Sequence, residues 1–169
     1  TGSEEFGTIA IHPVSGELYL AGATNSPTIP QLAKGAVTTY AAGVFAAFAA
    51  RFAPDLSSLR QSTLFGADNV TAALGIAFNP ATSDVYLGGV SDSTTLPASS
   101  SGAQPVFGGS QDGFVAWFDA SLRMLHRSTY YGATGDTTGR ALALHPVSHE
   151  LYLAGDTLST NLPGMGNSI

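Results

Sequence analysis

Several side chains with oxygen donors lie in segments rich in glycine, serine and threonine, where a chain turns between elements. They are Asp68, Asn69, Asp92, Gln111, Asp112 and Asp136. Carboxylate and amide oxygens are the ligands that Ca²⁺ prefers, but the Asp-x-Asp-x-Asp-Gly spacing of a calcium loop does not occur. We therefore assign these residues to turns and treat them as candidate contacts on a ligand-binding loop face. No catalytic, metal or cofactor role is assigned to them.

Two histidines, His145 and His149, stand four residues apart, a spacing that can chelate Zn²⁺ when both lie on one helix. They enclose the segment His-Pro-Val-Ser-His, and related segments read His-Pro-Val-Ser-Gly from residue 12 and Asn-Pro-Ala-Thr-Ser from residue 79. Proline and small polar residues favour turns. The pattern predicts a turn between two strands rather than a metal site.

Aromatic residues offer a second kind of chemistry, the stacking of sugar rings. Trp117 lies in the segment Phe114-Val115-Ala116-Trp117-Phe118, which has high β-propensity. Inside an alternating strand, its side chain is expected to pack against a neighbouring layer. Packing is the favoured interpretation and sugar binding is the alternative.

Sequence signatures of catalysis are absent: the chain has no Gly-x-Ser-x-Gly, His-Glu-x-x-His, Walker or Gly-x-Gly-x-x-Gly motif. The glycine-rich run 132–139 links two expected strands, so it lacks the helix N-terminus that binds phosphate. The adjacent acids Glu4 and Glu5 are expected in a solvated loop. No motif of this chain predicts an enzyme.

An internal repeat organises all of these residues. The segment Leu18–Gly22 returns as Val85–Gly89 and again as Leu151–Gly155, and the tyrosines at 19, 86 and 152 stand 67 and 66 residues apart. An apolar stretch and an X-Pro pair precede each copy, and a proline follows at 30, 97 and 163. The chain therefore contains two repeats and about half of a third.

Each repeat predicts four short strands. The apolar stretch ending at X-Pro is the first, because proline removes a ladder donor. The others are placed at Glu17–Thr24, Gly113–Phe118 and Met124–Tyr131 in one or another copy. Residues 40–52 have the alanine content and aromatic spacing of a helix, but the repeat aligns them with 106–118. We therefore predict a strand over Phe48–Phe52, with a short helical turn over 39–43 as an open alternative.

The repeat resembles the SBBP, or seven-bladed β-propeller, repeat family. The resemblance is carried by residues 135–144, by 151–159 with Leu162-Pro163, by Thr24-x-Ser26 and Ser91-x-Ser93, and by Gln111–Ala116. It covers nearly the whole chain. The chain departs from the family pattern at His12, Asn79 and His145, where the family has aspartate, and at 46–48. The resemblance implies a propeller fold in a secreted or surface-exposed bacterial protein.

These observations predict an all-β fold, a β-propeller of four-stranded antiparallel blades. Blade 1 is expected at 1–67, blade 2 at 68–134 and the first half of blade 3 at 135–169. Propellers close with about 4 to 8 blades, so the ring is incomplete. The rest of it is expected in the same polypeptide or in other subunits, of which this chain would be a fragment.

Each repeat is about 20 residues longer than a minimal blade of about 40–45. The additional residues lie at 26–47 and 93–113, between the second and third strands. We expect them on the same face as the loops between blades, together with the six candidate residues. Because loops on a rigid scaffold carry function, this face is the predicted binding face.

The composition excludes several classes of partner. Six Lys and Arg against twelve Asp and Glu give a net charge of -6, which disfavours a nucleic-acid surface. The most apolar run, 41–53, is shorter than the about 20 residues of a membrane-spanning helix. With no cysteine, the chain has no disulfide or thiolate metal site.

Two classes of function remain. The first is a non-catalytic binding or structural scaffold module, extracellular or on the cell surface, with protein or glycan partners. The second is one sector of a propeller hydrolase or lyase whose active site lies in other blades. A component of an extracellular filament is a further alternative. Gly7, Leu74 and Arg140, at matching inner-strand positions, do not repeat an acid or a histidine, which favours the first class.

Overall fold

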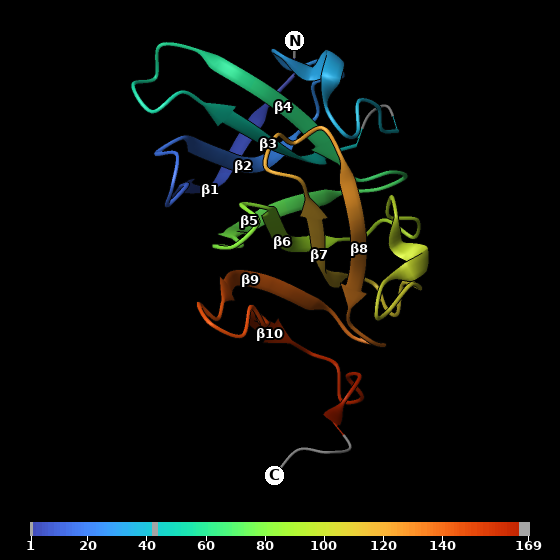
Figure 1. Ribbon diagram of the computed structural model, residues 1–169. Helices are drawn as coiled ribbons and strands as arrows, with labels where there is room; N and C mark the ends of the chain where they lie inside the picture. The colour runs from blue at the N-terminus through green and yellow to red at the C-terminus, as the bar shows by residue number, and fades with distance from the viewer. Residues whose placement is uncertain (1, 42–43, 166–169) are drawn as a thin grey trace.

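The computed structural model describes residues 2–41 and 44–165. Within these residues it contains β-strands and two short 3₁₀ segments but no α-helix. Three antiparallel sheets follow one another in chain order, the first at the top and the third at the bottom of Figure 1. The predictions of an all-β fold and of four-stranded antiparallel sheets are confirmed.

The strands of each sheet are neighbours in chain order. The first sheet holds β1 (Glu4–Ile11), β2 (Leu18–Thr24), β3 (Ala46–Phe52) and β4 (Leu59–Phe65), and the second holds β5 (Thr71–Phe78), β6 (Val85–Ser91), β7 (Asp112–Phe118) and β8 (Leu125–Tyr131). The third holds β9 (Thr137–Leu144) and β10 (Leu151–Thr157), and the 3₁₀ segments are η1 (Leu32–Lys34) and η2 (Ser99–Ser101). Among the described residues, no helix is long and apolar enough to cross a membrane.

Two ambiguous segments are now decided. The strand predicted over Phe48–Phe52 is confirmed, because β3 pairs with β2 on one side and with β4 on the other. Residues 39–41 are not helical, and 42–43 lie outside the described residues. The placement of Glu4 and Glu5 in a loop is wrong: both lie in β1, where they pair with Thr24 and Ala23.

The backbone repeats as closely as the sequence does. The first strand of each sheet has a register shift at the same repeat position, at Gly7, Leu74 and Arg140. The turn before each second strand passes through the left-handed region, at Gly16, Ser83 and His149 with φ of 69°, 67° and 58°. These three positions therefore require one conformation whichever residue occupies them.

The sheets pack face to face, and their first strands come closest. β5 contacts β1, β2 and β3, while β9 contacts β5, β6 and β7. A Cβ atom on Gly7 would lie 2.2 Å from the carbonyl oxygen of Ala73, so β1 and β5 meet backbone to backbone. Small residues of the first sheet, such as Ala47 and Ala49, belong to the same buried cluster as large residues of the second, such as Phe114.

The long loops begin and end at the same end of the sheets as the segments that link one sheet to the next, because Thr24 pairs with Ala46 and Ala47 pairs with Phe65, but they do not stay at that end. The loop between β2 and β3 runs along the outer edge of β4, where the amides of Ser62 and Leu64 donate to the carbonyls of Gln31 and Val37. The loop between β6 and β7 covers β8 in the same way. Unpaired edge strands invite association with other chains, so these insertions close the outer edges of both complete sheets.

Candidate functional site

Asp68 is the most strongly hydrogen-bonded of the six predicted loop residues. It accepts hydrogen bonds from the hydroxyl of Ser93, from the amide of Thr94 at 3.0 Å and from the Thr94 hydroxyl at 2.6 Å. The hydroxyls of Ser93 and Thr94 lower the pKa of Asp68 to about 2. The neighbouring Asn69 accepts a bond from the amide of Val70 and stabilises its own turn.

Asp92, Gln111 and Asp136 lie where the second sheet meets the third. The Gln111 amide donates to Asp92 at 3.0 Å, and its oxygen accepts a bond from the Thr138 hydroxyl at 3.2 Å. Asp136 accepts a bond from the hydroxyl of Ser110, which precedes Gln111. These side chains therefore connect the two sheets.

The assignment of Asp112 to a turn on the loop face is wrong, because Asp112 is fully buried at the start of β7. One carboxylate oxygen accepts hydrogen bonds from the amide of Gly108 at 2.7 Å and from Gln104 at 3.4 Å, while the other has no partner. Burial raises the pKa of Asp112, and the Gly108 bond partly opposes this effect. Asp112 thus anchors the end of the long loop from the inside of the protein.

The structure does not gather the six residues into one ligand site. Asp68 and Asn69 belong to the junction of the first and second sheets, while Asp92, Gln111 and Asp136 belong to the next junction. The carboxylates of Asp68, Asp92 and Asp136 accept hydrogen bonds from other side chains of the protein. Within residues 2–41 and 44–165, no three His, Asp or Glu side chains form a group that could hold a metal ion.

The Thr/Ser-x-Ser element has a structural role that the sequence did not reveal. In each repeat the amide of its last serine donates at 3.0 Å to the hydroxyl two residues earlier, and these serines are Ser26, Ser93 and Ser159. The earlier hydroxyl also contacts the first strand, through Glu4, Thr71 and Thr137 in turn. The element therefore ends the second strand and fastens it to the first.

The histidines at the opposite end of the sheets stabilise turns. Nδ1 of His145 accepts the Ser148 amide at 3.0 Å, and Nδ1 of His12 accepts the Ser15 amide at 3.1 Å. In the second repeat the side-chain oxygen of Asn79 does the same for Ala81. The prediction of a turn at 145–149 is confirmed, since His149 itself has the left-handed backbone of a turn residue.

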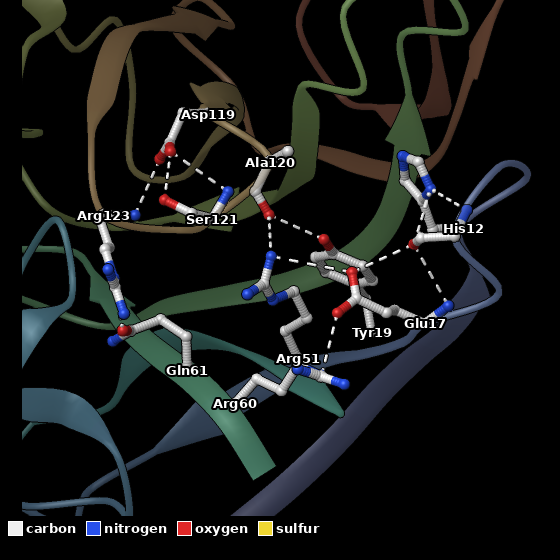
Figure 2. Close-up of polar contacts among 11 residues, drawn as sticks. His12, Glu17, Tyr19, Arg51, Arg60, Gln61, Asp119, Ala120, Ser121 and Arg123 are labelled. Atoms are coloured by element: carbon white, nitrogen blue, oxygen red, sulfur yellow. Dashed lines mark hydrogen bonds and ion pairs between the residues drawn. The ribbon is translucent and has the colours of Figure 1, made fainter. Parts of the chain in front are cut away.

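A polar contact between the first and second sheets lies at this end, around Tyr19 (Figure 2). We call Glu17, Tyr19, Arg51 and Arg60 the Tyr19 cluster. The Tyr19 hydroxyl donates at 2.8 Å to the carbonyl oxygen of Ala120, and Arg51 donates to the same oxygen at 3.2 Å. Glu17 lies 3.8 Å from Arg51 and 3.2 Å from Arg60.

Ala120 belongs to the turn between β7 and β8, so the second sheet covers the cluster of the first. Tyr19 is 1% exposed, and burial raises the pKa of its phenol. Leu122 of the same turn is fully buried and its carbonyl accepts the amide of Ala36 at 3.0 Å. Its counterpart in the first sheet, Leu56, has the same left-handed backbone but is 62% exposed.

The equivalent residues of the second repeat form a different arrangement, which we call the Trp117 cluster: Asp84, Tyr86, Trp117 and His126. Trp117 Nε1 donates to Asp84 at 2.9 Å. The Trp117 ring stacks on Tyr86, with centroids 6.0 Å apart, and lies 4.6 Å from His126. The cluster is only half covered, since Tyr86 and Trp117 are both intermediate in exposure.

Sequence reasoning recognised the repeated tyrosines and the strand position of Trp117 but missed the contact with Ala120. The signal that could have indicated it is the leucine repeated at 56 and 122, in the middle of an otherwise polar turn. Comparisons with known proteins add no identification: no protein-family model matches the chain, and no curated protein matches it.

Proposed function

We propose that the three sheets are consecutive blades of a β-propeller of the SBBP kind, and that the chain is a non-catalytic binding or structural scaffold of a secreted or surface-exposed bacterial protein. The observation that carries the proposal is the packing of sheets whose first strands approach most closely, with the turn of one sheet covering the tyrosine of the sheet before it. This arrangement can be repeated around an axis.

The polar loop residues support a scaffold role. Asp68, Asp92 and Asp136 accept hydrogen bonds from other side chains of the protein. A carboxylate that is bonded internally in this way positions the loop that carries it. At the bulge of the third sheet, Arg140 pairs with Asp156.

Localisation is tested with antibodies raised against the purified chain. On the proposal, these antibodies label intact cells of the bacterium that produces the protein, or detect the protein in the culture fluid. Labelling that requires permeabilised cells would contradict it.

Binding is tested by applying the full chain to a glycan array. Any glycan bound by the loop end should be lost on Asn69→Ala with Thr94→Ala, two exposed residues of that end. The matched control is Val147→Ala, which changes a residue 80% exposed at the opposite end. A glycan that is lost only with the control would contradict the assignment of the binding face.

A further inference from the structure

We propose that the surface beside β10 is a docking site for a β-hairpin of the β7–β8 kind, presented by a further repeat. We call this surface the open hairpin site and define it by Tyr86, Ala103, Tyr131 and the free edge of β10. The inference rests on the proposed function and names a partner that would add strands to the third sheet.

The equivalent surface of the first sheet is covered by the β7–β8 hairpin. Three contacts define how this hairpin packs. The Tyr19 hydroxyl bonds to the Ala120 carbonyl, and the Ala36 amide bonds to the Leu122 carbonyl. The ring of Phe65, at the end of β4, lies 5.0 Å from that of Phe114. All three contacts are made by β7 or by the turn that follows it.

Each of these contact points has a counterpart on the second sheet at the repeat spacing. Tyr86 corresponds to Tyr19, Ala103 to Ala36 and Tyr131 to Phe65. Ala103 is exposed and Tyr131 is 39% exposed, whereas Phe65 is fully buried.

A cavity of about 260 Å³ lies at this place. Residues of the second sheet and its long loop line it together with residues of β10 and the segment after it: Ala103, Gln104, Val115, Thr129, Tyr130, Tyr131, Leu151, Leu153 and Pro163. The lining is mainly apolar, and it is bounded by the strand beside which a hairpin would be added. The cavity therefore has the position and character required for the aromatic side chains of an incoming strand.

The edge of β10 supplies the backbone partners. In the first two sheets the second strand pairs on both sides, β2 with β1 and β3, and β6 with β5 and β7. Within the described residues β10 pairs only with β9. A free edge of this kind accepts an added strand through main-chain hydrogen bonds, while pockets beside it select side chains.

The occupant is specified by the hairpin that fills the equivalent place. It carries aromatic residues four apart, as Phe114 and Phe118 do, and a leucine in left-handed conformation in its turn, as Leu122 does. A sugar fits the site less well, because the ring of Trp117 already has Tyr86 and His126 as partners.

The test adds a hairpin of this kind. A second copy of residues 104–134 is appended after residue 169, at the spacing of 66 residues, with the change Trp117→Phe in the appended copy only. Trp117 of the original chain then remains the single tryptophan. We expect its emission to shift to shorter wavelength, its quenching by acrylamide to fall, and amide exchange in β10 to slow by about tenfold or more.

The matched control carries Leu122→Asp in the appended copy, and it should give neither change. The segment with Trp117→Phe and with Leu122 retained is also supplied as a free peptide to the 169-residue chain, so that a misfolded fusion cannot decide the result. Slower exchange in β10 without a change at Trp117 overturns the assigned site. No change in either reporter, in fusion and with peptide, overturns the hairpin as partner. The cell-labelling and glycan tests give their results independently, so failure here is distinct from failure of the proposed function.

Discussion

The Tyr19 and Trp117 clusters occupy the same repeat position in neighbouring sheets, yet one is buried and the other is half exposed. Tyr19 lies under the turn between β7 and β8, whereas Tyr86 lies beside a sheet of two described strands. Tyr152, in the last sheet, is 56% exposed. Burial of this tyrosine therefore follows the number of strands on the next sheet and not the local sequence, which is nearly the same in all three copies.

The two clusters also differ in chemistry. The first uses Arg51 and Glu17, with side chains 19% and 16% exposed, and the second uses aromatic rings with Asp84. Ion pairs that retain contact with solvent contribute at most about 1 kcal/mol. Apolar burial contributes more, so the largest difference between the two regions should come from the leucine of the covering turn.

The largest difference in stability between the two regions is expected from Leu122→Ala. Removing a fully buried leucine should lower the free energy of unfolding by about 3 kcal/mol. Leu56→Ala is the matched control, because both leucines have positive φ and the backbone effect is therefore the same. Its effect should stay within about 0.5 kcal/mol. Urea unfolding measures both, and equal losses would contradict the docking of the turn.

A smaller effect is expected from Tyr19→Phe. The change removes the hydrogen bond to Ala120 but leaves Arg51 as a donor to the same oxygen, so the cost should be about 1 kcal/mol. Tyr86→Phe should cost less, because its hydroxyl is not covered by a turn. The pair of variants is compared by denaturant unfolding, and a larger loss from Tyr86→Phe would reverse the order.

A substitution in the repeated turn before the second strand is expected to raise the stability of the protein. Ser83→Gly should raise the free energy of unfolding by about 0.5 kcal/mol, since glycine relieves the left-handed backbone but adds entropy to the unfolded chain. Gly16→Ser at the equivalent position should lower it by a similar amount. Thermal unfolding of both variants checks whether the two turns are interchangeable.

The smallest expected effect is on the dependence of folding stability on pH in the acid range. The pKa of Asp68 is about 2 in the folded protein against 3.8 for a free side chain, so the unfolded chain binds a proton more readily. Its contribution is present above pH 3.8 and is lost as the pH falls toward 2. Asp68→Asn should flatten the dependence of stability on pH in this range. An unchanged slope would show that Asp68 is not held by Ser93 and Thr94.

Strand positions were predictable because their signals are local. Alternating apolar residues, X-Pro pairs and the 66-residue spacing placed every strand, even β3, whose alanines alone favour a helix. The prediction of a loop at Glu4 was wrong because charged side chains are common in solvated loops. In the structure the Glu4 carboxylate accepts a hydrogen bond from the Ser26 hydroxyl at 2.5 Å.

The path of the long loops and the contact of Tyr19 with Ala120 were not predictable from local signals. Both depend on packing between segments far apart in the chain, 101 residues in the case of Tyr19 and Ala120. Five of the six candidate residues lie outside the strands, as predicted, whereas Asp112 is buried at the start of β7. The sequence does not tell which hydroxyl or amide each of them bonds. Such pairings are fixed only when the sheets stack.

The packing described above implies that each sheet covers the repeated tyrosine of the sheet before it. Hydroxyl-radical footprinting with peptide mass spectrometry measures this on the unmodified chain, because Tyr19, Tyr86 and Tyr152 lie in similar sequences. The account predicts that Tyr152 is oxidised fastest, Tyr86 more slowly and Tyr19 most slowly. Equal rates at Tyr19 and Tyr152 would contradict it.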